Sequence, residues 1–467
     1  MATISSAGIG SGLDVNSIIT QLMAIEQQPL TALQTKATAI QSTVSEYGKI
    51  KSDVSTLNDL SVSLASSTTW NQTAATSSGT AVTATSNAAT AGTFSVEVQS
   101  LASVQTLAGV AGSPTATVGA GTLHIELGTW GVNQTSFTPK SGATAVDVAI
   151  AATDTLGDVR DKINAAGAGV TAMIMTDANG SRLLIRSNTT GADSAFRTSG
   201  MAAFAFDPSA GVTTMTQTQA AANAAATING LAVSSASNTL SNVVDGLTMT
   251  LNATTTATGP VTVTVGTDTT ALKKMITDFA AAYTAVNKVI ADDTKYDPVA
   301  KVGGILQGDS AAVGLQRQLR TLVGQSSGAS TMFAHLSDIG LQMQTDGSLT
   351  VNDTVLSNAL NNVSELKKAF SNSSATDPTQ DGFGKRFRVI TDSLLGVDGS
   401  LTARTDGLAQ QLKRNQDDQD TLNVRLTGIE SRLRAQYTAL DTVMAQLNGQ
   451  SSYITQQLAA FNNAKSN

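Results

Sequence analysis

Few residues in this chain could carry out catalysis or bind a metal ion. It has two histidines, His124 and His335, and no cysteine, which excludes thiol nucleophiles, thiolate metal sites and disulfide bonds. The two histidines fall in different predicted domains, so they cannot form a metal-binding cluster by themselves. A lone histidine is more often structural than catalytic, and we interpret both in that way.

One short motif could indicate a serine nucleophile. Gly324, Ser326 and Gly328 match the pattern G-x-S-x-G. That motif needs a strand before it, a helix after it, and an acid and a histidine later in the chain. Here a helix is expected before it, and the only later histidine, His335, is close by. We interpret the segment as a polar loop.

Two other clusters allow the same kind of test. Gly8, Gly10 and Gly12 resemble a phosphate-binding loop, but no strand precedes them and no lysine follows within the motif. We interpret them as a flexible leader. Three aspartates at 417, 418 and 420 could attract a cation, yet a solvated helix face explains them better. The sequence therefore predicts no catalytic, cofactor or metal site, and a protein that is not an enzyme.

Composition narrows the class of protein further. The chain has 467 residues, a formal net charge of −7, 4% aromatic and only 13% charged residues. An acidic chain argues against nucleic-acid binding, which needs a basic face. Low charge suits a surface that meets other protein subunits or lies outside the cell. No apolar run is long enough to span a membrane, and the first basic residue, Lys36, comes too late for a secretory signal peptide.

The elements that could provide such a surface lie at the two ends of the chain. Apolar residues recur at seven-residue intervals across 401–461, a repeat that makes a helix supercoil with a partner. The main series is Leu412, Gln419, Leu426, Leu433, Leu440, Leu447, Ile454 and Phe461, and a second series is Leu422, Ile429, Gln436 and Val443.

The N-terminal end offers the partner helix. Asp14 can cap a first helix that carries Ile18 and Leu22, and Pro29 should break or kink it. A second helix is expected from about 30 to 64, with the same spacing in Leu33, Ala37, Ile40, Val44, Tyr47 and Val54. The two ends are therefore predicted to form an antiparallel pair.

The outermost parts of this pair are expected to be mobile in the monomer. Burying the apolar side chains of the first helix would contribute roughly 8–15 kcal/mol, whereas ordering its residues costs about 13–26 kcal/mol. We therefore expect residues 1–30 and about 437–467 to order only in an assembly. The alternative is a helical pair that packs permanently on the same chain.

Between the ends, the apolar period changes from 3.6 to 2, which indicates half-buried strands. The sequence predicts an inner β-rich domain from 76–103 and 226–267, and an outer, variable β-rich domain from 104–225. The outer domain should contain a short helix at 155–164, and the Ala/Thr/Gln-rich stretch 213–226 reads as a linker. Helices return at 268, with others near 354–370 and 383–396 and a hairpin that turns at Asp346–Gly347.

The predicted fold class is thus multidomain α+β. Both termini, 1–75 and 268–467, form a helical coiled-coil or bundle leg, and the β-rich domains are inserted between them.

Several segments resemble the family of bacterial flagellar hook-associated protein 2, the filament caps (FliD family). The resemblance is carried by both ends and by the root of the insertion, in the right order along the chain. Its segments are 4–14, the following helix through Tyr47, Gly48 and Leu57, then 92–102, 306–310, 339–341, 436–441 and 451–458. Residues 228–230, 237–240 and 245–248 resemble a short repeat shared with flagellins. The outer domain is less distinctive.

The resemblance implies a structural, secreted, homo-oligomeric protein that forms a ring at the flagellar tip and promotes folding and insertion of exported flagellin. The implied partners are flagellin, further copies of the chain, the flagellar type III export apparatus and an export chaperone. We expect the contacts to be made by the terminal helices, through Ile18, Leu22, Leu33, Ile40, Val44, Leu426, Leu433, Leu440, Leu447, Ile454 and Phe461.

Two alternatives from other classes remain at this point. The β-rich domains could make the chain a surface adhesin that serves in cell adhesion, or the chain could be a flagellin-like junction subunit. The ending 452–457 favours the cap over the junction subunit. The subunit number of the ring, a ligand of the outer domain, strand pairing across the insertion and exact domain boundaries are not legible in the sequence.

Overall fold

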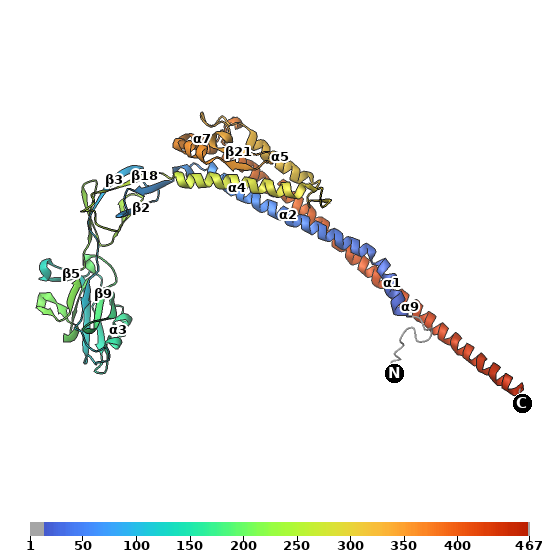
Figure 1. Cartoon of the computed structure of the whole chain (residues 1–467), viewed down its shortest axis with the longest axis horizontal. Helices are drawn as coiled ribbons and strands as arrows, with labels where there is room; N and C mark the ends of the chain where they lie inside the picture. The colour runs from blue at the N-terminus through green and yellow to red at the C-terminus, as the bar shows by residue number, and fades with distance from the viewer. Residues whose placement is uncertain (1–13, 466–467) are drawn as a thin grey trace. The chain divides into compact units, whose positions relative to one another are not determined.

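The computed structural model describes residues 14–465, apart from the side chains of Asn242 and of 461–465. The chain divides into two compact units (Figure 1). One comprises Met1–Trp70 with Thr270–Asn467, and the other comprises Asn71–Thr269. The first is mainly helical and the second mainly β, so the predicted multidomain α+β class, with helical termini around a β-rich middle, is confirmed. The expected glycine-rich leader, with Gly8, Gly10 and Gly12, lies outside the described residues.

The helical unit is built from both ends of the chain. Its helices are α1 (Val15–Glu26), α2 (Gln28–Ala65), α4 (Thr269–Thr294), α5 (Ser310–Gly324), α6 (Asp353–Ala359), α7 (Val363–Ser371), α8 (Phe383–Leu395) and α9 (Ser400–Lys465). Two short hairpins complete it, β19 (Tyr296–Asp297) with β20 (Val302–Gly303), and β21 (Leu341–Met343) with β22 (Leu349–Val351).

Local sequence signals account for most of these boundaries. Asp14 caps α1 by accepting a hydrogen bond from the Ser17 amide at 3.0 Å. Pro29 lies in the first turn of α2, where its missing N–H costs nothing. The predicted turn at Asp346–Gly347 is confirmed, and Gly347 takes the left-handed conformation that it requires.

One predicted helix, 354–370, is wrong in detail. A short 3-10 turn at Leu360–Asn362 separates α6 from α7. Asn361 and Asn362 are poor helix formers, because their side chains compete for backbone hydrogen bonds. Burial of Leu360 further favours a break that directs this side chain inward.

The core of the helical unit lies where α2, α4 and α8 meet. The predicted face of α4 is buried, including Leu272, Ile276, Phe279, Tyr283, Val286 and Ile290. Aromatic rings interlock at its centre, with Phe279 and Phe387 edge to face at 5.0 Å between centroids. This core gives α9 a fixed base, since Leu401 and Leu408 are buried in it.

The β unit contains an inner part in which strands from both sides of the insertion pair. One sheet has the order β1 (Thr73–Ser77), β18 (Val261–Thr267), β3 (Gly92–Ser100), β14 (Ala224–Ile228), β15 (Leu231–Ser235). A second sheet orders β16 (Thr239–Val244), β17 (Leu247–Leu251) and β2 (Val82–Ser86). Alternate residues such as Val96 and Val98 point into a common core.

The outer part of the β unit holds two further sheets. One orders β12 (Val212–Thr213), β11 (Phe206–Asp207), β10 (Ala195–Ser199), β5 (Gly121–Trp130) and β6 (Phe137–Pro139), with β7 (Val146–Ile150) also on β5. The other orders β13 (Thr216–Gln219), β4 (Thr106–Ala108), β9 (Gly180–Ser187) and β8 (Val170–Asp177).

The predicted linker 213–226 is wrong, because it contains β13 and the start of β14. Alanines are weak strand formers, but Ala224 and Ala226 are small enough to be buried on the inner sheet beside β3. Tertiary packing decides the conformation of this stretch.

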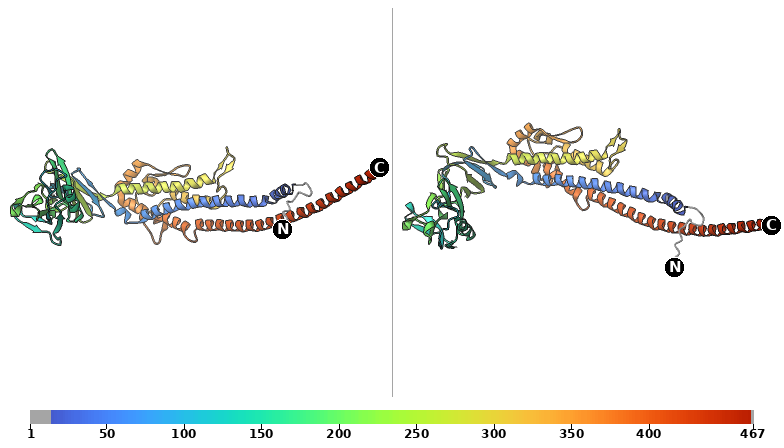
Figure 2. Two further views of the ribbon diagram at one scale, coloured as in Figure 1. Left: turned by 90° about the horizontal axis from the view of Figure 1, so that it is seen from below. Right: turned by 60° about the horizontal axis from the view of Figure 1, so that its bottom comes forward.

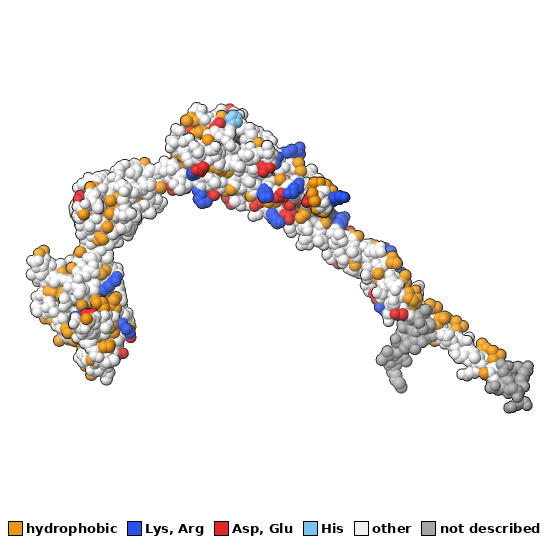
Figure 3. Space-filling view, viewed as in Figure 1, with side chains coloured by type: hydrophobic (Ala, Val, Ile, Leu, Met, Phe, Trp, Pro, Cys, Tyr) orange, Lys and Arg blue, Asp and Glu red, His pale blue; other side chains and the backbone are white. Residues whose placement is uncertain are grey.

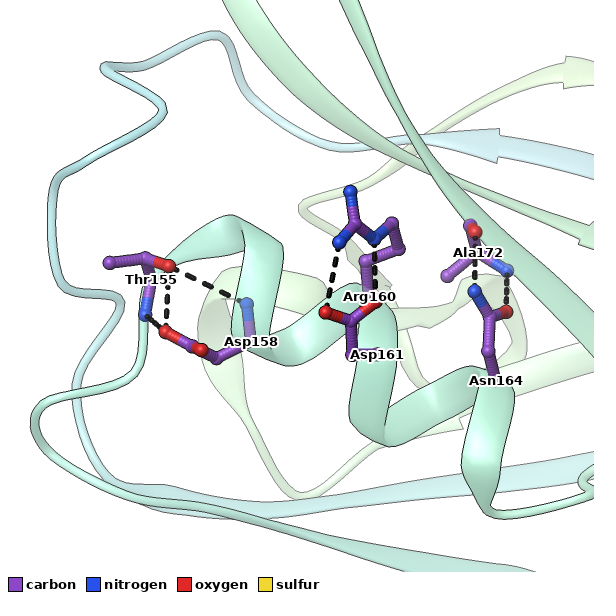
Figure 4. A network of polar contacts seen from close by, with 6 residues as sticks. All are labelled: Thr155, Asp158, Arg160, Asp161, Asn164 and Ala172. Carbon is purple, nitrogen blue, oxygen red and sulfur yellow. Dashed lines mark hydrogen bonds and ion pairs between the residues drawn. The ribbon is translucent and has the colours of Figure 1, made fainter. Parts of the chain in front are cut away.

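The predicted helix of the outer part is α3 (Leu156–Ala165), and it closes one sheet edge (Figure 4). Thr155 and Asp158 form a reciprocal capping box at its N-terminus. At its other end, the Asn164 amide donates to the Ala172 carbonyl at 3.0 Å and accepts from the Ala172 amide at 2.7 Å. The side chain thereby pairs the free edge of β8 at this residue.

Candidate assembly surface on the terminal helices

The helices α1 and α2 follow one another along α9, and each lies beside it (Figure 2). Both run antiparallel to α9, as predicted. Tyr47 lies near Arg404 at one end of the pairing, and Asn16 accepts a hydrogen bond from Arg434 at 3.3 Å near the other. The pair is therefore a feature of a single chain, at least as far as α1 reaches.

A charged junction fixes α9 where it leaves the helical core. Asp309 caps α5 and accepts from the Tyr47 hydroxyl at 2.8 Å and from Arg404 Nη2 at 2.7 Å. The Asp309 side chain is only 7% exposed. Three elements that are far apart in sequence, α2, α5 and α9, therefore meet at one carboxylate.

The junction favours one charge state. Burial acts to raise the pKa of Asp309, but the hydrogen bonds from Tyr47 and Arg404 outweigh it and hold the pKa below its usual range. Burial, reinforced by the hydrogen bond to Asp309, raises the pKa of Tyr47 to about 12. At neutral pH the carboxylate is charged and the phenol is neutral, which is the pairing that the geometry requires.

Further along, α1 packs on α9 through a separate apolar cluster, which we name the terminal cluster. It consists of Val15, Ile19, Met23 and Leu426, with Leu30, Leu422, Ile429, Leu433 and Tyr437 packed against it. Seven-residue spacing on α9 thus meets the apolar face of α1. Charged side chains are few on α1, so its contact with α9 depends on the burial of apolar side chains.

Beyond Tyr437 the same apolar stripe continues without a partner among the described residues. Leu440, Leu447 and Ile454 are 45%, 52% and 56% exposed. Figure 3 shows hydrophobic side chains recurring along this part of α9. We name this set the exposed stripe: Leu440, Val443, Leu447, Ile454 and Leu458.

The structure places the predicted contact residues in three groups. Ile40, Val44, Leu426 and Leu433 pack within the chain, and Ile18 and Leu33 are half-buried. Leu22 and the three residues Leu440, Leu447 and Ile454 are exposed. The side chain of Phe461 lies outside the described residues. Their role as contacts with partners stays a prediction.

Sequence reasoning missed several residues of this region. Tyr453 and Leu458 are exposed beside the predicted series. Leu458 lies four residues after Ile454 and three before Phe461, so the 4-3 spacing of the series could have identified it. Asn415 is a buried polar residue on the same helix, and Gln419, which the predicted series includes, is buried beside it. A signal for them exists, since residues 413–421 include no apolar side chain.

Among the described residues, none of the candidates for catalysis or metal binding come together in one site. His124 pairs with Asp147 in the β unit, whereas Nδ1 of His335 lies 3.6 Å from Oδ2 of Asp338 in the helical unit. Ser326 follows helix α5, and its carbonyl accepts from Arg386 at 2.9 Å, so the polar-loop interpretation is confirmed. Asp417 pairs with Lys413, and Asp420 accepts from Gln416. Within residues 14–465, no cluster of His, Cys, Asp or Glu could hold a metal ion.

None of the helices described in 14–465 is both long and apolar enough to cross a bilayer.

Fold and site together define a structural protein, with a helical unit made by both termini and an exposed apolar stripe on α9. Comparisons with known proteins identify the family. Residues 11–105 match the family model described as the N-terminus of flagellar hook-associated protein 2, and residues 221–449 match its C-terminus. Residues 132–189 match the flagellin hook IN motif. That match falls in the outer part, whereas the predicted flagellin-like repeat lies at 228–230, 237–240 and 245–248.

Relatives agree along nearly the whole chain. Flagellar hook-associated protein 2 of Escherichia coli K12 is 31% identical over 451 residues, covering 91% of this chain and 92% of the relative. The B-type protein of Pseudomonas aeruginosa is 28% identical, covering 90% of each. A crystal structure of the D1–D2–D3 domains of the E. coli flagellar cap protein FliD superimposes with a TM-score of 0.55 and 29% identity, covering 78% of this chain and 99% of that one.

This chain belongs to the flagellar hook-associated protein 2 family, the filament caps. The predicted family, the filament-cap function and the location at the flagellar tip outside the cell are confirmed at that level. The comparisons do not favour the adhesin or the flagellin-like junction subunit.

Proposed function

We propose that several copies of this chain form a closed ring on the flagellar tip, where the ring promotes the folding and insertion of flagellin. A closed ring of more than two identical subunits needs head-to-tail contacts. The ring acts as a structural device and not as an enzyme. It shelters the site where each arriving flagellin folds, and then shifts to the next site.

The single observation that carries this proposal is the change in burial along one continuous apolar series of α9. Leu426 is buried against α1, whereas Leu440, Leu447 and Ile454 are about half exposed on the same helix face. A solvent-exposed apolar series at regular spacing is a surface prepared for a partner. We propose flagellin as the partner, with Leu22 contributing to the contact; the predicted contact residue Phe461 has its side chain outside the described residues.

Low charge suits the task of binding repeatedly at different positions. Between 438 and 464, Asp441 is the only charged residue. A surface with so few charges tolerates small shifts of register, because apolar attraction is non-directional. The predicted residues Ile40, Val44, Leu426 and Leu433 then hold the stripe in position, while Ile18 and Leu33 lie at the border of the two sets.

Further parts of the proposal concern dynamics, domains and export. Residues 14–30 and about 437–465 are held fully only in the assembly; the remaining parts of the predicted mobile segments, 1–13 and 466–467, lie outside the described residues. The functional divisions are 1–75 with 268–467, 76–103 with 226–267, and 104–225. The chain reaches the tip through the flagellar type III apparatus with an export chaperone, which agrees with the low charge and the absence of cysteine.

The experiment is complementation of a cell that lacks its cap and expresses the cognate flagellin. Flagellin is compared in the medium and in attached filaments, with and without this protein. Movement of flagellin from the medium into filaments supports the proposal. Flagellin that stays in the medium, despite confirmed export of both proteins, contradicts it.

A further inference from the structure

The pairing of the terminal helices is interrupted by a polar layer formed by Asn415 and Gln419 of α9. These side chains are 4% and 8% exposed. Gln419 Nε2 donates to Asn415 Oδ1 at 2.6 Å. Gln419 occupies a position of the seven-residue series at which every other described member is apolar, so the layer replaces an apolar contact with an amide.

The layer separates two apolar cores that do not touch. The main helical core ends with Ile40 on α2 and with Leu408 and Leu412 on α9. The terminal cluster begins at Leu422 on α9 and at Leu30 on α2. Leu33, between them, belongs to neither.

The surface of the helical pair is hollowed beside this layer. A depression of about 290 Å³, open to solvent, is lined by Lys36, Ile40, Gln411, Arg414, Asn415 and Asp418, and only Ile40 and Asn415 of these are buried. Residues 413–421 of α9 carry no apolar side chain. Close-packed apolar contacts between α2 and α9 are therefore missing over more than two turns of α9.

We propose that the polar layer is a soft joint, which allows α1 and the part of α9 from 422 onward to open and move as a unit separate from the helical core. Buried amides in a helical seam fix its register but reduce its stability. The segment beyond the layer then has a lower opening free energy than the core, as local units of proteins commonly do. In a cap, the joint would let the exposed stripe follow a binding site that moves; this last step rests on the proposed function.

The test is hydrogen exchange of the full chain, followed on peptides from 15–26 and 422–437 and, for the core, from 47–64 and 279–290. We expect the terminal peptides to exchange at least about 100-fold faster than the core peptides, because they open without it. Asn415→Leu with Gln419→Leu should slow the terminal peptides about ten-fold or more and leave the core unchanged. Equal protection of the two regions, or no slowing in the variant, would overturn the joint.

Two control variants make the result specific. Gln410→Leu with Gln416→Leu adds the same two side chains at exposed positions of α9, and it should leave the exchange of 15–26 unchanged. Leu426→Asn weakens the terminal cluster directly, so it should speed exchange of 15–26 and spare 47–64. If Leu426→Asn also loosens 47–64, the two cores unfold together and no joint exists.

Complementation then separates the joint from its role in the cap. The Asn415→Leu/Gln419→Leu protein should still be exported and assembled on the tip, yet filaments should grow more slowly. Normal filament growth by a variant in which hydrogen exchange of the terminal peptides is measurably slower would overturn the role of the joint. Failure of the wild-type protein to complement would instead contradict the proposed function and leave the exchange result standing.

Discussion

The hydroxyl of Tyr47 donates a hydrogen bond to Asp309 Oδ1 at 2.8 Å, joining two residues that are 262 positions apart. Arg404 reaches the other oxygen of the same carboxylate at 2.7 Å. The base of α9 is thus tied to α2 and α5 before α9 continues as the helix that carries the exposed stripe. The direction of that helix depends on this junction as well as on apolar packing.

Tyr47→Phe removes the bond and keeps the ring. A hydrogen bond to a charged group contributes about 1.5–3 kcal/mol, so the free energy of unfolding of the helical unit should fall by about that amount. Urea unfolding followed by helical circular dichroism measures the change. Tyr296→Phe, at an exposed tyrosine, is the control and should change little. A loss below about 0.5 kcal/mol for Tyr47→Phe would mean that the bond is replaced by water at little cost.

The helical unit should lose stability in acid because paired carboxylates become protonated. Lys368, with the Ser330 hydroxyl and the Thr331 amide, lowers the pKa of Glu365 from 4.5 to about 2. A carboxylate with a lowered folded-state pKa stabilises the fold above its unfolded pKa, and this contribution disappears as the pH falls through the folded value. For Glu365 the window runs from about pH 4.5 down to about 2, and Asp309 changes in the same direction.

The variant Glu365→Gln tests the predicted loss of stability on acidification. The variant should be clearly less stable than the wild type at about pH 5, and the difference should shrink toward about pH 3. Thermal unfolding at both pH values measures it. A difference that grows on acidification would show that the assigned direction is wrong.

Replacement of Gly48 and of Gly384 by alanine should change the stability of the helical unit in opposite directions. A Cβ at Gly384 would lie 2.9 Å from the backbone of Ala65 and of Phe370, whereas a Cβ at Gly48 meets nothing within 4 Å. Gly48→Ala should stabilise α2 by about 0.5–1 kcal/mol. Gly384→Ala should destabilise the unit by about 1–3 kcal/mol, because backbone must move. Equal effects in urea unfolding would contradict the close approach of α8 to α2.

Asn164 should protect the edge of β8. Asn164→Ala leaves the N–H and C=O of Ala172 without their side-chain partner, at a cost of about 1–3 kcal/mol. Hydrogen exchange at 170–176 in the full chain should therefore become faster. Asn164→Asp retains an acceptor for the Ala172 amide, and it should have an intermediate effect. Unchanged exchange in both variants would show that the pairing contributes little.

Long periodic elements could be predicted from the sequence because their signals are local. The series from Leu412 to Ile454 predicted α9, the matching series from Leu33 to Val54 predicted its antiparallel partner, and Asp14 and Pro29 marked helix boundaries. Each of these depends on residues within a few turns of one another, so the pattern and its cause lie in the same stretch of chain.

Other features depend on contacts between distant residues, which no single stretch encodes. Ala224 and Ala226 form part of a strand only because β3 lies beside them. The Tyr47–Asp309–Arg404 junction joins three helices, and none of the three residues is unusual locally. Gln419 was included in the apolar series, yet its burial beside Asn415 needed the position of α2. For the exposed stripe, the sequence predicted the face of the helix but not where α1 stops covering it.

The most direct test of the assembly surface is the triple variant Leu440→Asp, Leu447→Asp, Ile454→Asp in a cell that lacks its cap. The control is Thr438→Asp, Ala445→Asp, Ser452→Asp, which adds the same charge at the same spacing, at exposed positions about 160° away on the helix. Flagellin is compared in the medium and in attached filaments. We predict that the stripe variant is exported and folded but leaves flagellin in the medium, whereas the control supports filaments. Normal filaments from the stripe variant would contradict the role of this surface in capping.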